Sequence, residues 1–120
     1  MDIVIYEENA RQRSHLKNVI QKAAPPRSDV ADFNNSDVLL EYIGKKYSSV
    51  AFISLEDERG RGYLLARRLK ERFPRTNLIF LSRNQMYMKE AMKLRYSGYI
   101  SSPTITKEII QDELYNLRYL

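Results

Sequence analysis

Polar side chains that could bind a cation or a phosphate group follow four short apolar runs of the sequence. Glu7 and Glu8 follow the first run, Ser54 and Glu56 stand at the end of the second, Ser82 follows the third, and Ser-Ser-Pro at 101–103 follows the last. Carboxylates are hard oxygen ligands for ions such as Mg²⁺, and hydroxyls supply hydrogen bonds. If these segments converge, they form a cluster of carboxylates and hydroxyls, and we expect no lysine or arginine to join it directly.

The composition excludes several other kinds of reactive site. The 120-residue chain has no cysteine and a single histidine, His15, which excludes disulfides, thiolate metal sites, cysteine nucleophiles and multi-histidine metal centres. His15 stands beside Leu16 in a predicted helix, where we expect a place on the helix surface or at the core edge. The net charge is +5, and because the basic residues are spread along the chain we interpret them as a solvated surface.

Five short runs rich in Val, Ile, Phe and Tyr have the length of β-strands. We predict strands at residues 3–6, 29–33, 50–55, 78–81 and 99–100. Most of these runs are continuously apolar, which is typical of parallel strands that helices bury on both faces.

Helical patterns separate the predicted strands and follow the last one. Apolar residues recur at helical spacing in 16–23, 38–42, 65–73, 88–95 and 110–117. Ser36 and Thr106 are candidate N-caps, and Pro74 ends the third helix. The alternation predicts an α/β fold, a (βα)5 doubly wound sheet of five parallel strands with helices on both faces. In such a sheet ligands bind in the crevice outside the carboxyl ends of the strands, where the polar residues above would gather.

The order and spacing of these segments resemble the receiver domain of response regulators. The likeness to receivers of LytTR (LytR/AlgR-type) transcription regulators is carried by VAFISLEDERGRGYLLARRLKERFP, in which Gly62 falls eight positions after Ser54, and by LIFLSRNQMYMKEAMKLRYSGYISSP. It covers essentially the whole chain. The resemblance implies a flavodoxin-like, CheY-like fold and a signalling role in a two-component phosphorelay, without enzymatic activity.

In that family a sensor histidine kinase phosphorylates an aspartate at the end of the third strand, and an acidic pair holds Mg²⁺. The resemblance places the acidic pair at Glu7 and Glu8. It places the switch hydroxyl at Ser82 and the aromatic residue coupled to it at Tyr99. Pro103 matches the proline after the family's active-site lysine, where a cis peptide is frequent.

Two positions depart from the family pattern, and in the family both take part directly in phosphoryl transfer. Ser54 stands at the phosphoacceptor position and Ser102 at the lysine position. A serine hydroxyl is a poor nucleophile and metal ligand without an activating base, and a missing lysine removes the cation that stabilises a transferring phosphoryl group. We therefore expect no phosphotransfer by the aspartyl route and weak or no Mg²⁺ binding at Glu7 and Glu8. Repulsion between these two carboxyls is expected to raise one of their pKa values.

The sequence thus predicts an atypical receiver, a pseudo-receiver, that acts in transcription regulation by docking a protein partner or by dimerisation. We expect the interface on the fourth helix, fifth strand and fifth helix, whose candidate residues are Met88, Lys93, Tyr99, Asp112 and Arg118.

Two alternatives stay open. Asp57, three residues beyond the strand end, could accept phosphate in a receiver with a noncanonical acceptor, if the loop took a different path. The basic stretch Arg67, Arg68, Lys70, Arg72 and Arg75 could instead bind nucleic acid directly, with an affinity that falls steeply with salt.

We expect residues 1–120 to form one receiver-like domain. The resemblance implies a LytTR DNA-binding domain after Leu120 in a longer regulator, and DNA contact through that domain only. No apolar run approaches the length of a membrane span, and the N-terminal segment has acids directly after a short apolar run, unlike a signal peptide. We therefore expect a cytoplasmic protein with no membrane partner.

Overall fold

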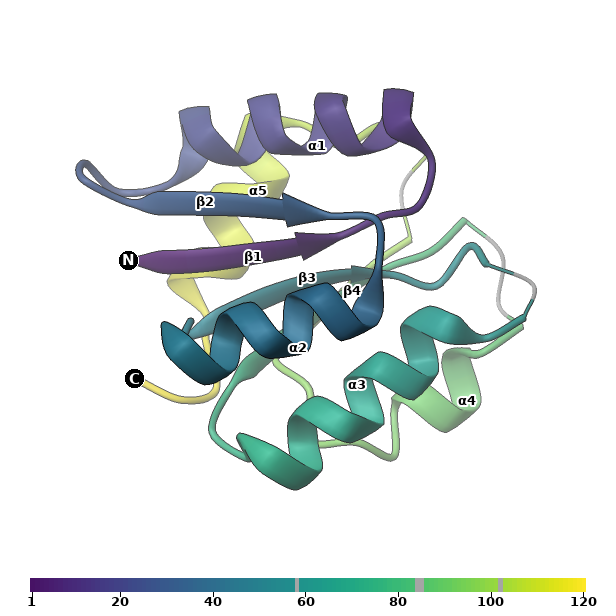
Figure 1. The fold of residues 1–120 in the computed structure, drawn as a ribbon. Coiled ribbons are helices and arrows are strands. Elements are labelled where there is room, and N and C mark those ends of the chain that lie inside the picture. The colour runs from purple at the N-terminus through teal and green to yellow at the C-terminus, as the bar shows by residue number, and fades with distance from the viewer. Residues whose placement is uncertain (58, 84–85, 102) are drawn as a thin grey trace.

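Five parallel strands form one sheet in the order β2-β1-β3-β4-β5 (Figure 1). The computed structural model describes residues 1–57, 59–83, 86–101 and 103–120. The strands are β1 (Asp2–Tyr6), β2 (Asp29–Phe33), β3 (Val50–Ser54), β4 (Asn77–Leu81) and β5 (Gly98–Ile100). All the predicted strands are confirmed, each within one residue of its predicted bounds. β3 and β4 are buried throughout, as their continuous apolar runs predicted.

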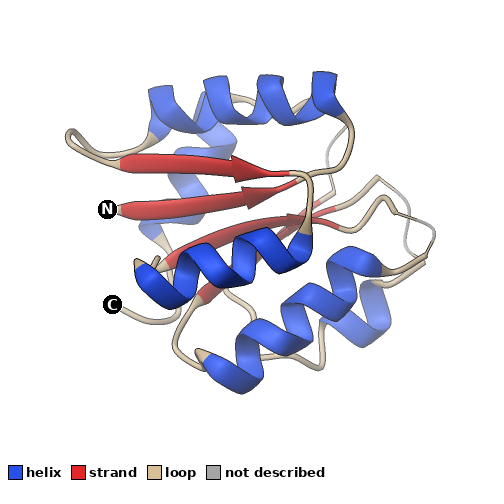
Figure 2. Ribbon diagram, in the orientation of Figure 1, coloured by secondary structure: helices blue, strands red, loops and turns tan. Residues whose placement is uncertain are grey.

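Helices cover both faces of the sheet (Figure 2). The helices are α1 (Ala10–Ala23), α2 (Ser36–Lys45), α3 (Arg61–Arg72), α4 (Met88–Ala91) and α5 (Lys107–Tyr115). Successive strand residues point to opposite faces, so the sheet contributes to two cores. Val4 and Ala51 pack with α2 and α3, whereas Ile3 and Phe52 pack with α1 and α5. The predicted doubly wound (βα)5 fold is confirmed.

Local sequence explains where most helices begin and end. Thr106 caps α5 as predicted, because its hydroxyl accepts a hydrogen bond from the Ile109 amide at 3.2 Å. The cap predicted at Ser36 is wrong by one residue: the Asn35 side chain accepts from the Val38 amide at 3.1 Å, and Ser36 begins α2. α3 ends at Arg72, ahead of Pro74.

Two helices differ from their predicted pattern. Val38 begins the apolar pattern 38–42 that predicts α2, but it is 54% exposed, because Leu39, Leu40 and Ile43 form the stripe that faces the sheet. α4 has one turn and ends at Ala91 instead of extending to 95. Among the described residues, no helix has the combination of length and apolar character that crossing a bilayer requires.

Candidate functional site

The predicted polar residues meet at the carboxyl ends of the central strands. β1 and β3 are neighbours, with Tyr6 beside Ile53, so Glu7 and Ser54 leave the sheet at the same edge. In the sheet, β2 lies on one side of β1, and β3 and β4 lie on the other side. The strand order therefore reverses at β1, which makes this edge a switch point of the sheet. Glu7, Ser54 and Ser82 are all at least nine-tenths buried and line one hollow of about 300 Å³. Arg11, Gln12, His15, Leu16, Glu56, Leu81, Arg83, Ile100 and Ile105 complete its lining.

Gly62 brings the start of α3 against the end of β3. A Cβ atom at this position would overlap the backbone carbonyl oxygen of Ser54. Gly60, the residue before α3, has φ of 74°, in the left-handed region that favours glycine. These two glycines therefore set α3 close to the strand ends and place its first side chain, Arg61, beside the acidic pair.

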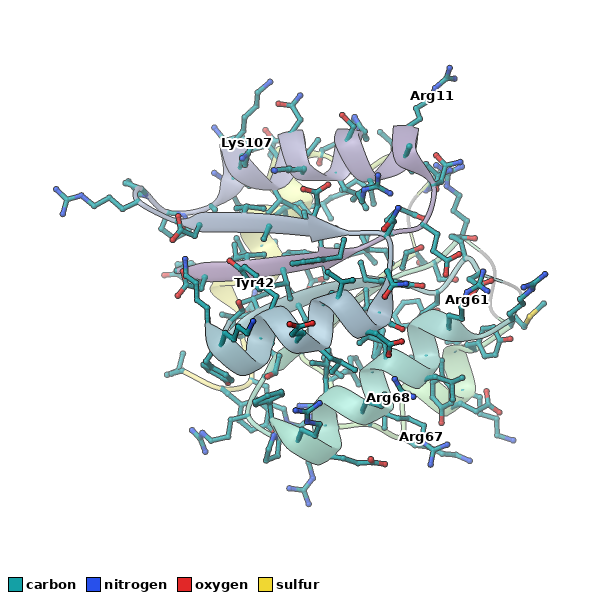
Figure 3. All side chains as sticks on the ribbon, in the orientation of Figure 1. Arg11, Tyr42, Arg61, Arg67, Arg68 and Lys107 are labelled. Atoms are coloured by element: carbon teal, nitrogen blue, oxygen red, sulfur yellow. The ribbon has the colours of Figure 1, made fainter. Side chains whose placement is uncertain are left out.

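Arg61 forms a two-point ion pair with Glu8. Its Nε donates to Glu8 Oε2 and its Nη2 donates to Glu8 Oε1, both at 2.7 Å. The Tyr6 hydroxyl donates to the same Oε2. The hydrogen bonds from Arg61, and to a smaller extent the one from Tyr6, hold the pKa of Glu8 below its usual range. Burial raises the pKa of Tyr6, and the hydrogen bond to the Glu8 carboxylate raises it further. Figure 3 shows Arg61 projecting from α3 at this end of the sheet.

The expectation that no lysine or arginine joins the acidic pair is therefore wrong. The cluster does contain a cation, because the first residue of α3 reaches back over the strand ends. For Glu8, the hydrogen bonds from that cation outweigh the desolvation that burial causes, so the pKa of this carboxyl is lowered, the opposite of the rise expected for one member of the pair. Arg61 was missed because it lies 53 residues from Glu8 along the chain. Its i, i+4 spacing from Asp57 was the one local signal.

Asp57 lies in the crevice. With Glu7, Glu8 and Ser54 it lines a second hollow of about 280 Å³ next to the first. Its Oδ1 accepts a hydrogen bond from the Arg59 amide at 3.1 Å, and its Oδ2 accepts one from the Arg61 amide at 3.0 Å. These hydrogen bonds hold the carboxylate beside the acidic pair, a position that the sequence alone did not assign to Asp57.

The carboxylates of the crevice do not fit an Mg²⁺ site. Glu7 Oε2 accepts the Asn9 amide at 3.0 Å, and both oxygens of Glu8 are engaged by Arg61. Asp57 Oδ2 lies 3.1 Å from Arg61 Nε. Mg²⁺ requires several oxygens in near-octahedral geometry. Across the described residues, no three His, Cys, Asp or Glu side chains are grouped so that they could hold a metal.

The other site positions predicted from the resemblance are Ser82, Tyr99, Ser102 and Pro103. Ser82 is buried, and its amide donates to the Ile100 carbonyl at 3.0 Å. The Tyr99 ring packs 6.1 Å from Phe80, and its buried hydroxyl has no hydrogen-bond partner among the described residues. Pro103 is exposed. Ser102 lies outside the described residues, and so does the peptide bond that joins it to Pro103.

His15 lies on α1 as predicted, but two of the candidate interface residues lie outside the expected elements: Lys93 follows the end of α4, and Arg118 follows the end of α5. His15 is exposed on α1, although it also reaches the rim of the larger hollow. Lys93, Asp112 and Arg118 are exposed, and Met88 and Tyr99 are half-buried.

Comparison with known proteins identifies the fold. No protein-family model matches the sequence, and no curated protein matches it. NtrX from Brucella abortus in complex with ATP is similar, with a TM-score of 0.80 and 15% identity over 96% of this chain. This chain spans only 26% of that NtrX chain.

Two smaller solved proteins are similar over nearly their whole length. The chemotaxis protein CheY4 from Vibrio cholerae has a TM-score of 0.79 and 14% identity, over 95% of each chain. The BeF3-activated receiver domain of DrrB has a TM-score of 0.76 and 16% identity, over 95% of this chain and 93% of that one. The switch-point crevice, the strand order and these superpositions together establish that the chain has the five-stranded fold of CheY-like receiver domains.

Proposed function

We propose that this chain is an atypical receiver of a two-component or transcription-regulating system, with no catalytic activity of its own, that does not take phosphate by the aspartyl route. One observation carries the proposal: a buried serine, Ser54, ends β3 at the point where a receiver needs a carboxylate. A hydroxyl there cannot accept a phosphoryl group without a base to activate it.

The ion pair of Glu8 supports the same proposal. A guanidinium stays protonated at every physiological pH, so Arg61 is a permanent counter-ion for Glu8. In a phosphorylated receiver that carboxylate would face a metal ion. Here the crevice carries its own cation, so Glu8 has a counter-ion without added Mg²⁺.

Treatment with a small phosphodonor tests this proposal. The full chain is incubated with acetyl phosphate and millimolar Mg²⁺, and its intact mass is measured beside that of an active receiver domain. We expect the active receiver to gain one phosphoryl group and this chain to gain none. Phosphate on the wild-type chain that is labile to hydroxylamine would contradict the proposal.

A restored variant serves as the matched control. Ser54→Asp with Ser102→Lys returns the two missing groups, and adding Arg61→Ala frees Glu8 for a metal ion. We expect Mg²⁺ binding and phosphorylation to be stronger in the triple variant than in the double variant, because the guanidinium competes with the metal for Glu8. Equal behaviour of the two variants would show that Arg61 does not compete with the metal ion for Glu8.

A phosphorylatable receiver that uses Asp57 is the second candidate. It is favoured by the position of Asp57, which lines the same hollow as Ser54 and the acidic pair. Both carboxylate oxygens already accept hydrogen bonds that hold the turn into α3, so phosphorylation would disrupt that turn. In the same mass experiment this candidate predicts an adduct that Asp57→Asn abolishes.

We further propose that the face formed by α4, β5 and α5 docks a second copy of the chain or a sensor kinase. Met92, at the end of α4, is 44% exposed, and apolar side chains of this kind are common in protein interfaces. Met92→Asp is expected to weaken self-association measured by sedimentation velocity. The matched change Leu64→Asp, at an apolar residue of α3 that is 50% exposed, is expected to have no effect. The resemblance of the sequence supports a LytTR DNA-binding domain as the output in a longer regulator.

A further inference from the structure

A cluster of positive charge lies at the opposite end of the molecule from the crevice. Its members come from the last turn of α3, the α3–β4 connection, the α4–β5 connection and the segment after α5, so they gather near the amino ends of β4 and β5 (Figure 1). Four of them line one hollow together with Pro74, Leu94 and Tyr119, and the fifth acts on Lys70 electrostatically. These residues, here called the basic cluster, are Lys70, Arg75, Lys93, Arg95 and Arg118.

The basic cluster has no internal counter-ion. Within the described ranges, none of its members is within ion-pair distance of a carboxylate. Burial and the nearby charges of Arg118 and Arg95 lower the pKa of Lys70 to about 8. Like charges held together in this way repel one another, and a bound anion would relieve that repulsion.

A buried side chain, Asn77, holds the segment that supports the basic cluster. Asn77 is 1% exposed, and its side chain binds both backbone groups of Tyr119: Oδ1 accepts from the amide at 2.7 Å, and Nδ2 donates to the carbonyl at 2.8 Å. The Tyr119 ring lies 4.6 Å from Lys70 Nζ and 5.3 Å from Arg75 Cζ. Arg118 donates from Nη1 to the Tyr96 carbonyl at 3.2 Å. These contacts fix the cations without neutralising them.

The basic stretch of α3 suggested by the sequence is not this surface. Arg68 forms an ion pair with Asp37 at 3.0 Å, and Arg67 lies over the Tyr63 ring. Figure 3 labels Arg67 and Arg68 on α3. Lys70 and Arg75 belong to the cluster because the chain after α5 and the α4–β5 connection add cations beside them.

We propose that the basic cluster binds the phosphate backbone of a nucleic acid without reading its sequence, a contact beyond the proposed signalling function. Its charges come from four separate segments, which suits a polymer with repeated phosphates. A single small anion fits less well, because Lys70 already donates to the Pro74 and Thr76 carbonyls at 3.1 and 2.8 Å. A lipid surface also fits less well, since Leu94 and Tyr119 in the hollow are half-buried and offer little to insert.

Salt-dependent binding of a short mixed-sequence DNA duplex, followed by fluorescence anisotropy, tests the proposal on the full chain. Each phosphate neutralised contributes about −0.9 to the slope of log affinity against log salt, so we expect a slope between about −3 and −5. Arg75→Ala with Arg95→Ala is expected to make the slope less negative by about 2 and to weaken binding to all DNA sequences equally.

Lys22→Ala with Lys107→Ala is the matched control. It removes the same charge from exposed sites on α1 and α5, on the other face of the sheet, and its slope is expected to equal that of the wild type. Circular dichroism checks that both variants are folded. Absence of duplex binding at low salt would overturn the proposal, and so would equal losses in the two variants. Binding to anionic vesicles but not to the duplex would overturn it in favour of a lipid surface.

Discussion

At the scale of single residues, charge contacts determine what the crevice can bind. Ser54 removes the carboxylate from the end of β3, and Arg61 engages both oxygens of Glu8. Each change alone would weaken a metal site, since Mg²⁺ prefers anionic oxygens that are not otherwise paired. Together they leave a crevice whose carboxylates already accept hydrogen bonds from the protein.

The lowered pKa of Glu8 predicts how its ion pair depends on pH. A carboxyl whose pKa is lower in the folded chain stabilises the fold above its ordinary pKa of 4.5, and this contribution is lost as pH falls through the lowered value. Glu8→Gln is therefore expected to reduce the free energy of unfolding at pH 7 and to have little effect well below pH 4.5. Urea denaturation at both pH values measures this.

Glu41→Gln is the control for that experiment. It breaks an exposed i, i+4 pair with Lys45 on α2, at 71% and 78% side-chain exposure, and such pairs contribute little to stability. A loss for Glu8→Gln that is the same at both pH values would contradict the role given to the ion pair.

At the scale of secondary-structure elements, the approach of α3 to β3 positions the site. Gly60 and Gly62 allow this approach, one through its backbone conformation and the other through its missing side chain. Arg61 stands between them, so the packing of the helix and the ion pair of the crevice depend on the same three residues.

Gly62→Ala is expected to destabilise the fold by about 1–3 kcal/mol, because its Cβ would overlap the Ser54 carbonyl oxygen and force the backbone to shift. Gly44→Ala, inside α2 with open space around it, is expected to stabilise the fold by about 0.5–1 kcal/mol through helix propensity. Thermal or urea unfolding measures both. Equal effects of the two changes would show that helix propensity, and not the close approach to β3, governs position 62.

At the scale of the whole molecule, the sheet has a distinct surface at each end. The carboxyl ends of the strands carry the crevice in which Arg61 pairs with Glu8 and Asp57, and the amino ends of β4 and β5 carry the basic cluster. Asn77 joins three parts of the second end, because its side chain binds Ser49, Ser97 and Tyr119. The segment after α5 is therefore part of the folded domain.

Asn77→Ala is expected to cost about 1–3 kcal/mol of stability, because it removes the hydrogen-bond partner of the half-buried amide and carbonyl of Tyr119. Hydrogen exchange is expected to show faster exchange of the Tyr119 amide, while β1 stays protected. Unchanged exchange at Tyr119 would mean that Asn77 does not anchor this segment.

Strand and helix positions could be predicted from the sequence because apolar periodicity and caps are local signals. The same local order placed Glu7 and Ser54 at one edge, since strands that are adjacent and parallel end together. The substitution at position 54 is also evident in the sequence alone. Only the folded chain reveals that Arg61 neutralises Glu8, that Asp57 lies in the crevice, and that five cations from four segments share one surface. Those contacts join residues far apart in the chain, and their distances depend on how closely helices and connections pack, which no local pattern encodes.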